Sequence, residues 1–128
     1  MKTLLGITAL IEAATGAGLL VSPPLVAELL LGASLAPAPA LIVGRVAGAA
    51  LLALGIACWF GREDGASRAA HGLVFSMLVY NTVTTVVLTY SGMTLRLAGL
   101  LLWPAVALHA ALVVWCAVCL WHRAVARV

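Results

Sequence analysis

Four apolar stretches dominate this chain, and prolines or charged residues separate them. A helix needs about 20 mostly apolar residues to cross a hydrocarbon core of about 30 Å. The four stretches have this length, and between Arg68 and Arg96 there is no charged residue at all. The sequence therefore predicts four transmembrane helices, over residues 3–22, 41–60, 69–90 and 97–121.

The composition excludes most other classes of protein. Hydrophobic residues make up 65% of the chain and charged residues 9%, against about 45–50% and about 25% in soluble domains. A soluble chain of 128 residues could not bury so much apolar surface, and disordered chains are polar. The 7 Lys and Arg residues form no basic stripe, so no nucleic-acid partner is expected. The prediction is an all-α integral membrane protein whose first partner is the lipid bilayer.

Prolines mark the ends of two of the stretches. Pro23-Pro24 cannot continue the first helix, and a proline-rich linker at 36–39 precedes the second. The segment 25–36 is too short to cross and carries Glu28, so we expect it to lie along the membrane interface. The start also resembles a secretory signal, but Glu12 interrupts its apolar run, which favours a retained span.

The positions of Lys and Arg predict the orientation. With four spans, both termini and the loop at 61–68 lie on one side of the membrane. That side carries more of the basic residues, which marks it as cytoplasmic: it holds Lys2, Arg62, Arg68, Arg123 and Arg127, whereas the other side holds Arg45 and Arg96. We therefore expect a multi-pass protein of the cell inner membrane with both termini in the cytoplasm.

Small residues recur at helical spacing in the first two spans. Gly44 and Gly48 form one such pair, and Gly55 follows one heptad later. In lipid, such residues allow close approach of helix backbones. With short connections, the simplest arrangement is an up-down four-helix bundle forming a single membrane domain over residues 1–128.

Each span carries one residue that is costly in lipid: Glu12, Arg45, Asn81 and His109. At a rise of 1.5 Å per residue, Glu12 lies roughly 13 Å into the first span, and Asn81 and His109 lie roughly 15–18 Å into theirs. We expect an interior polar cluster in which Glu12 and Arg45 form an ion pair and the other two are hydrogen-bond partners. Two interpretations stay open: structural polar contacts that specify helix register, or a path for a proton, an ion or a ligand.

Soft side chains gather near the cytoplasmic boundary. Their types suit zinc or copper, and a thiol redox role is a second option. Buried cysteines that act as small hydrophobes are the alternative. The candidate residues are Cys58, Cys116, Cys119, His71 and His122.

The first half of the chain resembles the DoxX-like assemblage of small four-helix bacterial membrane proteins. The resemblance rests on the run Gly16–Leu20, on Pro23, on Leu31-Gly32 and on the run Gly44–Gly55. It implies a similar size and topology, and some members are linked to quinone or thiol redox complexes. The chain departs from the pattern at Arg45, where the assemblage has an acidic residue.

No nucleophile–base pair and no phosphate or nucleotide motif is found, so the sequence predicts no enzymatic activity, cofactor or metal requirement. We expect an accessory or assembly subunit of a larger membrane complex, bound to other membrane subunits or to copies of itself. One alternative is a small proton-coupled carrier that uses the intramembrane polar cluster. Another is a quinone- or thiol-linked redox subunit.

Overall fold

The computed structural model describes residues 1–65 and 67–125, with side chains as far as His122. Within these residues it consists of helices and contains no strand, which confirms the all-α prediction. Four of the helices are long and apolar enough to cross a membrane, α5 over Leu102–His122. The helices are α1 (Lys2–Val21), α2 (Pro23–Leu31), α3 (Ala38–Gly61), α4 (Arg68–Met93) and α5 (Leu102–Val125).

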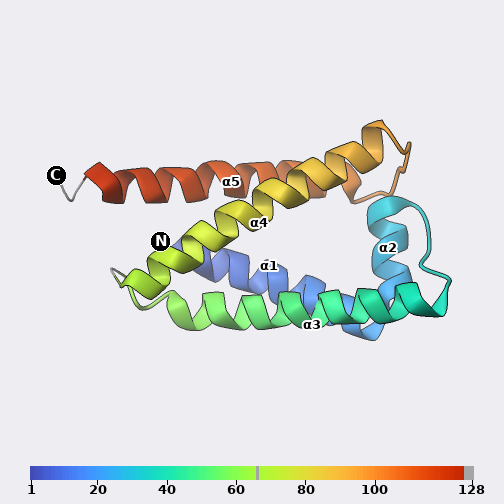
Figure 1. The fold of residues 1–128 in the computed structure, drawn as a ribbon, viewed down its shortest axis with the longest axis horizontal. Helices are drawn as coiled ribbons and strands as arrows, with labels where there is room; N and C mark the ends of the chain where they lie inside the picture. Colours follow the sequence, from blue (N-terminus) through green and yellow to red (C-terminus); the bar gives the residue numbers. More distant parts are fainter. Residues whose placement is uncertain (66, 126–128) are drawn as a thin grey trace.

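The four long helices run in alternate directions and form two close pairs (Figure 1). Helix α1 packs chiefly against α3, and α4 packs chiefly against α5. The start of α1 and the end of α5 lie at the same end of the molecule, and the short helix α2 lies at the opposite end. Residues that are distant in sequence are therefore brought together both within each pair and where the pairs meet.

Local sequence explains where the helices begin and end. Pro23 and Pro24 occupy the first turn of α2, where a missing N–H is tolerated. Gly32 ends α2 in the left-handed conformation (φ 70°), which glycine adopts without a steric penalty. At the start of α4, the Ser67 hydroxyl accepts a hydrogen bond of 3.0 Å from the backbone N–H of Ala70.

The last helix begins at Leu102, five residues later than the predicted span. The segment before it instead docks on α2: the Leu101 N–H donates to the Leu29 carbonyl at 2.8 Å. Gly99 lies so close to the backbone of Leu30 that no larger residue fits there. The apolar pattern of the sequence does not reveal this contact with another helix. The predicted span therefore began too early.

Helices α1 and α3 approach to backbone contact. A Cβ atom placed on Gly16 would lie 2.6 Å from the backbone nitrogen of Leu52, and one on Gly48 would lie 2.8 Å from the carbonyl oxygen of Gly16. A Cβ on Gly55 would lie 2.9 Å from the backbone nitrogen of Ala13. The predicted close packing of the first two spans through small residues is therefore confirmed.

All four long helices contribute to one apolar cluster, toward the end where α1 starts. It fills the interior there with close-packed side chains, and it joins the two helix pairs. Its members are Leu4, Leu5, Ala9, Cys58, Val74, Met77, Leu112 and Cys116.

Candidate functional site

A buried carboxyl group, that of Glu12, is the most unusual feature of the interior. The Glu12 side chain is 1% exposed, and its Oε1 atom has no hydrogen-bond partner. The Tyr80 side chain of α4 is in hydrogen-bonding contact with this carboxyl group, and Thr84 contacts Tyr80 in turn. A carboxyl group removed from water in this way needs a partner or a neutralising charge.

A second polar contact joins α4 to α5. The Nδ1 atom of His109 lies 2.7 Å from the Asn81 Oδ1 atom, and an amide oxygen can only accept, so His109 is the donor. The Asn81 amide donates to the carbonyl oxygen of Met77 at 2.7 Å. Asn81 is fully buried, and its side chain is held from two directions.

Tyr80 connects these two contacts. Its ring packs edge-to-face against the His109 ring, with centroids 5.9 Å apart and planes at 78°. Glu12, Tyr80, Asn81 and His109 thus form one continuous polar cluster across α1, α4 and α5. Three of these residues were predicted from the sequence, and Tyr80 was not. Its position directly before Asn81, and one turn before Thr84, was the available signal.

The predicted ion pair between Glu12 and Arg45 is wrong. Arg45 is exposed, and no ion pair joins it to Glu12. On α3 the residue level with Glu12 is Gly55, which faces Ala13. Arg45 lies ten residues away along the helix, about 15 Å. It is also rotated about 100° from Gly44, which packs against α2 through Pro23.

The described cysteine and histidine side chains lie in different surroundings and do not converge as the ligands of a metal site do. Cys58 and Cys116 are both fully buried in the apolar cluster, Cys119 packs against it, and all three thiols are free. His71 is half-buried and His122 is exposed. Among the residues that the structure describes, no three His, Cys, Asp or Glu side chains come together in a way that could hold a metal ion.

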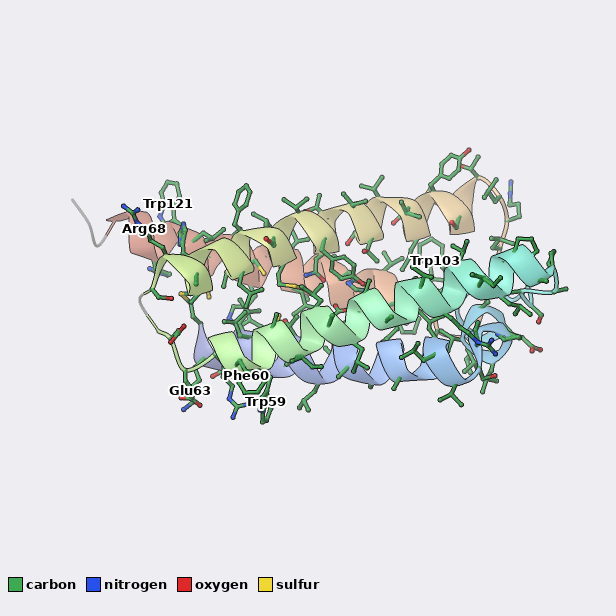
Figure 2. The ribbon with its side chains drawn as sticks, turned by 60° about the horizontal axis from the view of Figure 1, so that its bottom comes forward. Trp59, Phe60, Glu63, Arg68, Trp103 and Trp121 are labelled. Carbon is green, nitrogen blue, oxygen red and sulfur yellow. The ribbon has the colours of Figure 1, made fainter. Side chains whose placement is uncertain are left out.

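Charged and aromatic residues gather at the end of the molecule where α1 starts. Figure 2 shows Trp59, Phe60, Glu63, Arg68 and Trp121 toward this end and Trp103 nearer the other.

The Glu63 carboxylate accepts hydrogen bonds from Lys2 Nζ at 2.8 Å and from Arg62 Nε at 3.2 Å. These hydrogen bonds, the one from Lys2 first, hold the pKa of the Glu63 carboxyl below its usual range. The Arg62 guanidinium also stacks on Trp59, 3.2 Å from the ring centre. Arg123 and Arg127, which also contribute to the predicted orientation, lie outside the side chains that the structure describes.

An apolar groove lies on the outer side of the α1–α3 pair. It has a volume of about 240 Å³. Small residues of the two helices contribute to its lining, and larger apolar side chains complete it. The lining residues are Ala9, Leu10, Ala13, Gly55, Ile56, Trp59 and Phe60.

Comparisons with protein-family models, with curated proteins and with solved structures found no match. The chemistry of the site therefore rests on its geometry alone. The polar cluster can bind or release a proton at Glu12 and can hold α4 against α5. The outer groove can accept an apolar side chain or a helix.

Proposed function

We propose that this chain is a non-enzymatic, four-span protein of the inner membrane that packs into, or assists assembly of, a larger membrane complex. In this proposal residues 1–128 form a single membrane domain, an up-down four-helix bundle with both termini in the cytoplasm. Membership of the DoxX-like assemblage is part of the proposal, on the strength of the glycine and leucine pattern between residues 16 and 55.

The orientation follows from the distribution of charge. Lys2, Arg62 and Arg68 lie at the end where α1 starts, and basic residues favour the cytoplasmic side. Trp59 and Trp121 are exposed near this same end, where interfacial aromatic residues anchor a span.

The groove between α1 and α3 is the observation that carries the proposed function. Every residue that lines it is apolar. Because lipid tails are themselves apolar, there is little hydrophobic driving force for helices to associate. Contacts between membrane proteins therefore depend on small residues and close packing. A groove with Ala9, Ala13 and Gly55 in its lining meets that need. Its occupant in our proposal is an apolar transmembrane helix of a partner protein.

Site-specific photo-cross-linking tests this assignment. A photoreactive benzoylphenylalanine at position 10, in the groove, is activated in native membranes, and the adducts are identified by mass spectrometry. We expect one discrete adduct with another membrane protein. Ile56→Trp fills the groove and abolishes this adduct, because the indole ring occupies the space of the partner helix.

Ile42→Trp is the matched control. Ile42 is also exposed on α3 but lies outside the groove, so this variant keeps the adduct. An adduct of twice the chain mass would identify a second copy as the occupant and contradict the proposal. Equal loss of the adduct in both variants, or no discrete adduct at all, would also contradict it.

A further inference from the structure

Two buried oxygen atoms on α1 have no hydrogen-bond partner. They are Oγ1 of Thr8 and Oε1 of Glu12, and both side chains are 1% exposed. Residues four apart lie on the same face of a helix, one turn from each other. The two atoms therefore face the same region of the interior.

The free hydroxyl of Thr8 contrasts with the hydroxyls of α4. Membrane-helix serines and threonines commonly satisfy their hydroxyl by donating to the carbonyl four residues earlier. Four hydroxyls of α4 do so at 2.7–3.0 Å, and Thr8 does not. Buried polar groups without partners are rare in proteins and point to a missing water molecule or ion. The four that donate are Ser76, Thr82, Thr85 and Ser91.

Among the side chains that the structure describes, no Lys or Arg pairs with Glu12. Lys2 and Arg62 are paired with Glu63 at the end of the molecule, and Arg45 is exposed. The other three acidic side chains, Glu28, Glu63 and Asp64, are exposed. Within the described part of the chain, Glu12 is therefore a single buried acidic site whose carboxylate form no side chain neutralises.

The titratable groups that face Glu12 come from three other helices. Tyr80 of α4 is in hydrogen-bonding contact with the carboxyl, and Cys58 of α3 lies within electrostatic range of it. The His109 ring of α5 packs against the Tyr80 ring, and its Nδ1 atom is hydrogen-bonded to Asn81. Cys116 of α5 lies within electrostatic range of Cys58. The groups nearest to the carboxyl are thus a phenol and a thiol, and neither becomes positively charged on binding a proton.

We propose that Glu12 and Thr8, together with the Tyr80 hydroxyl, form an intramembrane binding site for one small monovalent cation. The ligand is either Na⁺ or a proton carried on the Glu12 carboxyl with a water molecule bridging to Thr8. Both supply a single positive charge to oxygen ligands, and one carboxylate balances one such charge. This site is independent of the proposed partner helix.

Infrared spectroscopy of the purified full chain in lipid nanodiscs tests the proton. In sodium-free choline buffer near neutral pH, we expect the C=O stretch of a protonated carboxylic acid. Glu12→Gln removes this band, because the other three acidic side chains, Glu28, Glu63 and Asp64, are exposed rather than buried. A band that survives in Glu12→Gln would overturn the assignment to Glu12.

Thermal unfolding tests sodium. Replacing choline chloride with sodium chloride raises the unfolding temperature of the wild type if Na⁺ is the ligand, since a ligand that binds only the folded state stabilises it. It does not raise that of Glu12→Gln. A wild type with neither the acid band nor a sodium-dependent unfolding temperature has no cation at Glu12, and the proposal is then wrong.

Thr8 variants test the second ligand. Thr8→Val keeps the shape but removes the oxygen, and we expect it to weaken the affinity for whichever cation binds about tenfold, the equivalent of about 1.4 kcal/mol. Thr8→Ser restores the hydroxyl and the affinity. Thr82→Val, on an exposed threonine of α4, is the matched control and leaves the affinity unchanged. If Thr8→Val binds the cation as the wild type does, Thr8 is not a ligand and the site as proposed is wrong.

Discussion

The two helix pairs of this protein are held together in different ways. Between α1 and α3, glycines bring the two backbones into direct contact at Gly16, Gly48 and Gly55. Between α4 and α5, the side chains of Asn81 and His109 share a hydrogen bond of 2.7 Å. Gly92 of α4 meets side chains of α5 rather than its backbone. The chain thus uses both of the main means of association available to helices in lipid, close packing and interhelical polar contacts.

Because the two helix pairs are held together differently, we expect them to tolerate substitutions to different degrees. A backbone contact leaves no room for even one additional methyl group, whereas a side-chain contact can be replaced by another pair of suitable size. We therefore expect α1–α3 to be the less tolerant pair. The polar cluster lies where the two helix pairs meet, because Glu12 belongs to α1 and its partner Tyr80 belongs to α4.

The largest effect is expected at the α1–α3 contact. Gly16→Ala places a Cβ 2.6 Å from the Leu52 nitrogen, so the helices must separate. Overpacking of this kind costs about 1–3 kcal/mol, which outweighs the gain of up to about 1 kcal/mol in helix propensity. We expect a lower unfolding temperature in detergent or nanodiscs.

Gly72→Ala is the matched control for this substitution. Gly72 lies on α4 with no atom within 4 Å of the added Cβ, so here the propensity gain acts alone and the variant is at least as stable as the wild type. If the two variants were equally stable, the α1–α3 contact would not be as tight as the structure shows.

An intermediate effect is expected at the α4–α5 contact. A double-mutant cycle with Asn81→Ala and His109→Ala measures the coupling between the two side chains by reversible unfolding in lipid. Interhelical hydrogen bonds in membrane proteins give about 0.6 kcal/mol on average and about 1.7 kcal/mol at most, and we expect a value in this range. A coupling of zero would mean that the hydrogen bond does not stabilise the pair.

The smallest effect is expected at the exposed ion pair that links α1 to the loop after α3. The hydrogen bond from Lys2 holds the pKa of Glu63 below its usual range. A lowered folded-state pKa gives a contribution that is complete above the ordinary carboxyl pKa and lost as the pH falls through the lowered value. Glu63→Gln should therefore lower the unfolding temperature slightly at neutral pH and not at acidic pH, and added salt should reduce the difference. A difference that grows on acidification would contradict this account.

Much of the architecture was predictable because length and apolarity alone determine which segments can cross a bilayer. The approximate limits of α1, α3 and α4 follow from apolar runs, prolines and charges, and the glycine spacing indicated which helices pack closely. The late start of α5 was not predictable, because it depends on the contact between Leu101 and Leu29 of a different helix.

For the candidate site, the level of each residue along its helix was predictable, but the direction of its side chain was not. Counting residues along a helix predicts that Glu12, Asn81 and His109 lie at a similar level, because the rise per residue is constant. It does not reveal which way each side chain points, and this is how Arg45 entered the prediction and Tyr80 was overlooked. Rotation of a helix about its axis is set by its packing partners.

The amino-acid pattern was enough to predict four helices long and apolar enough to cross a membrane, two of them able to pack through glycine, and a carboxyl group in the middle of the first. The packing of the helices was needed to show that this carboxyl faces Tyr80 rather than Arg45, and that Oγ1 of Thr8 and Oε1 of Glu12 have no hydrogen-bond partner. This division arises because solvation by lipid acts on each helix separately, whereas hydrogen bonding of buried polar atoms depends on how neighbouring helices are turned toward one another.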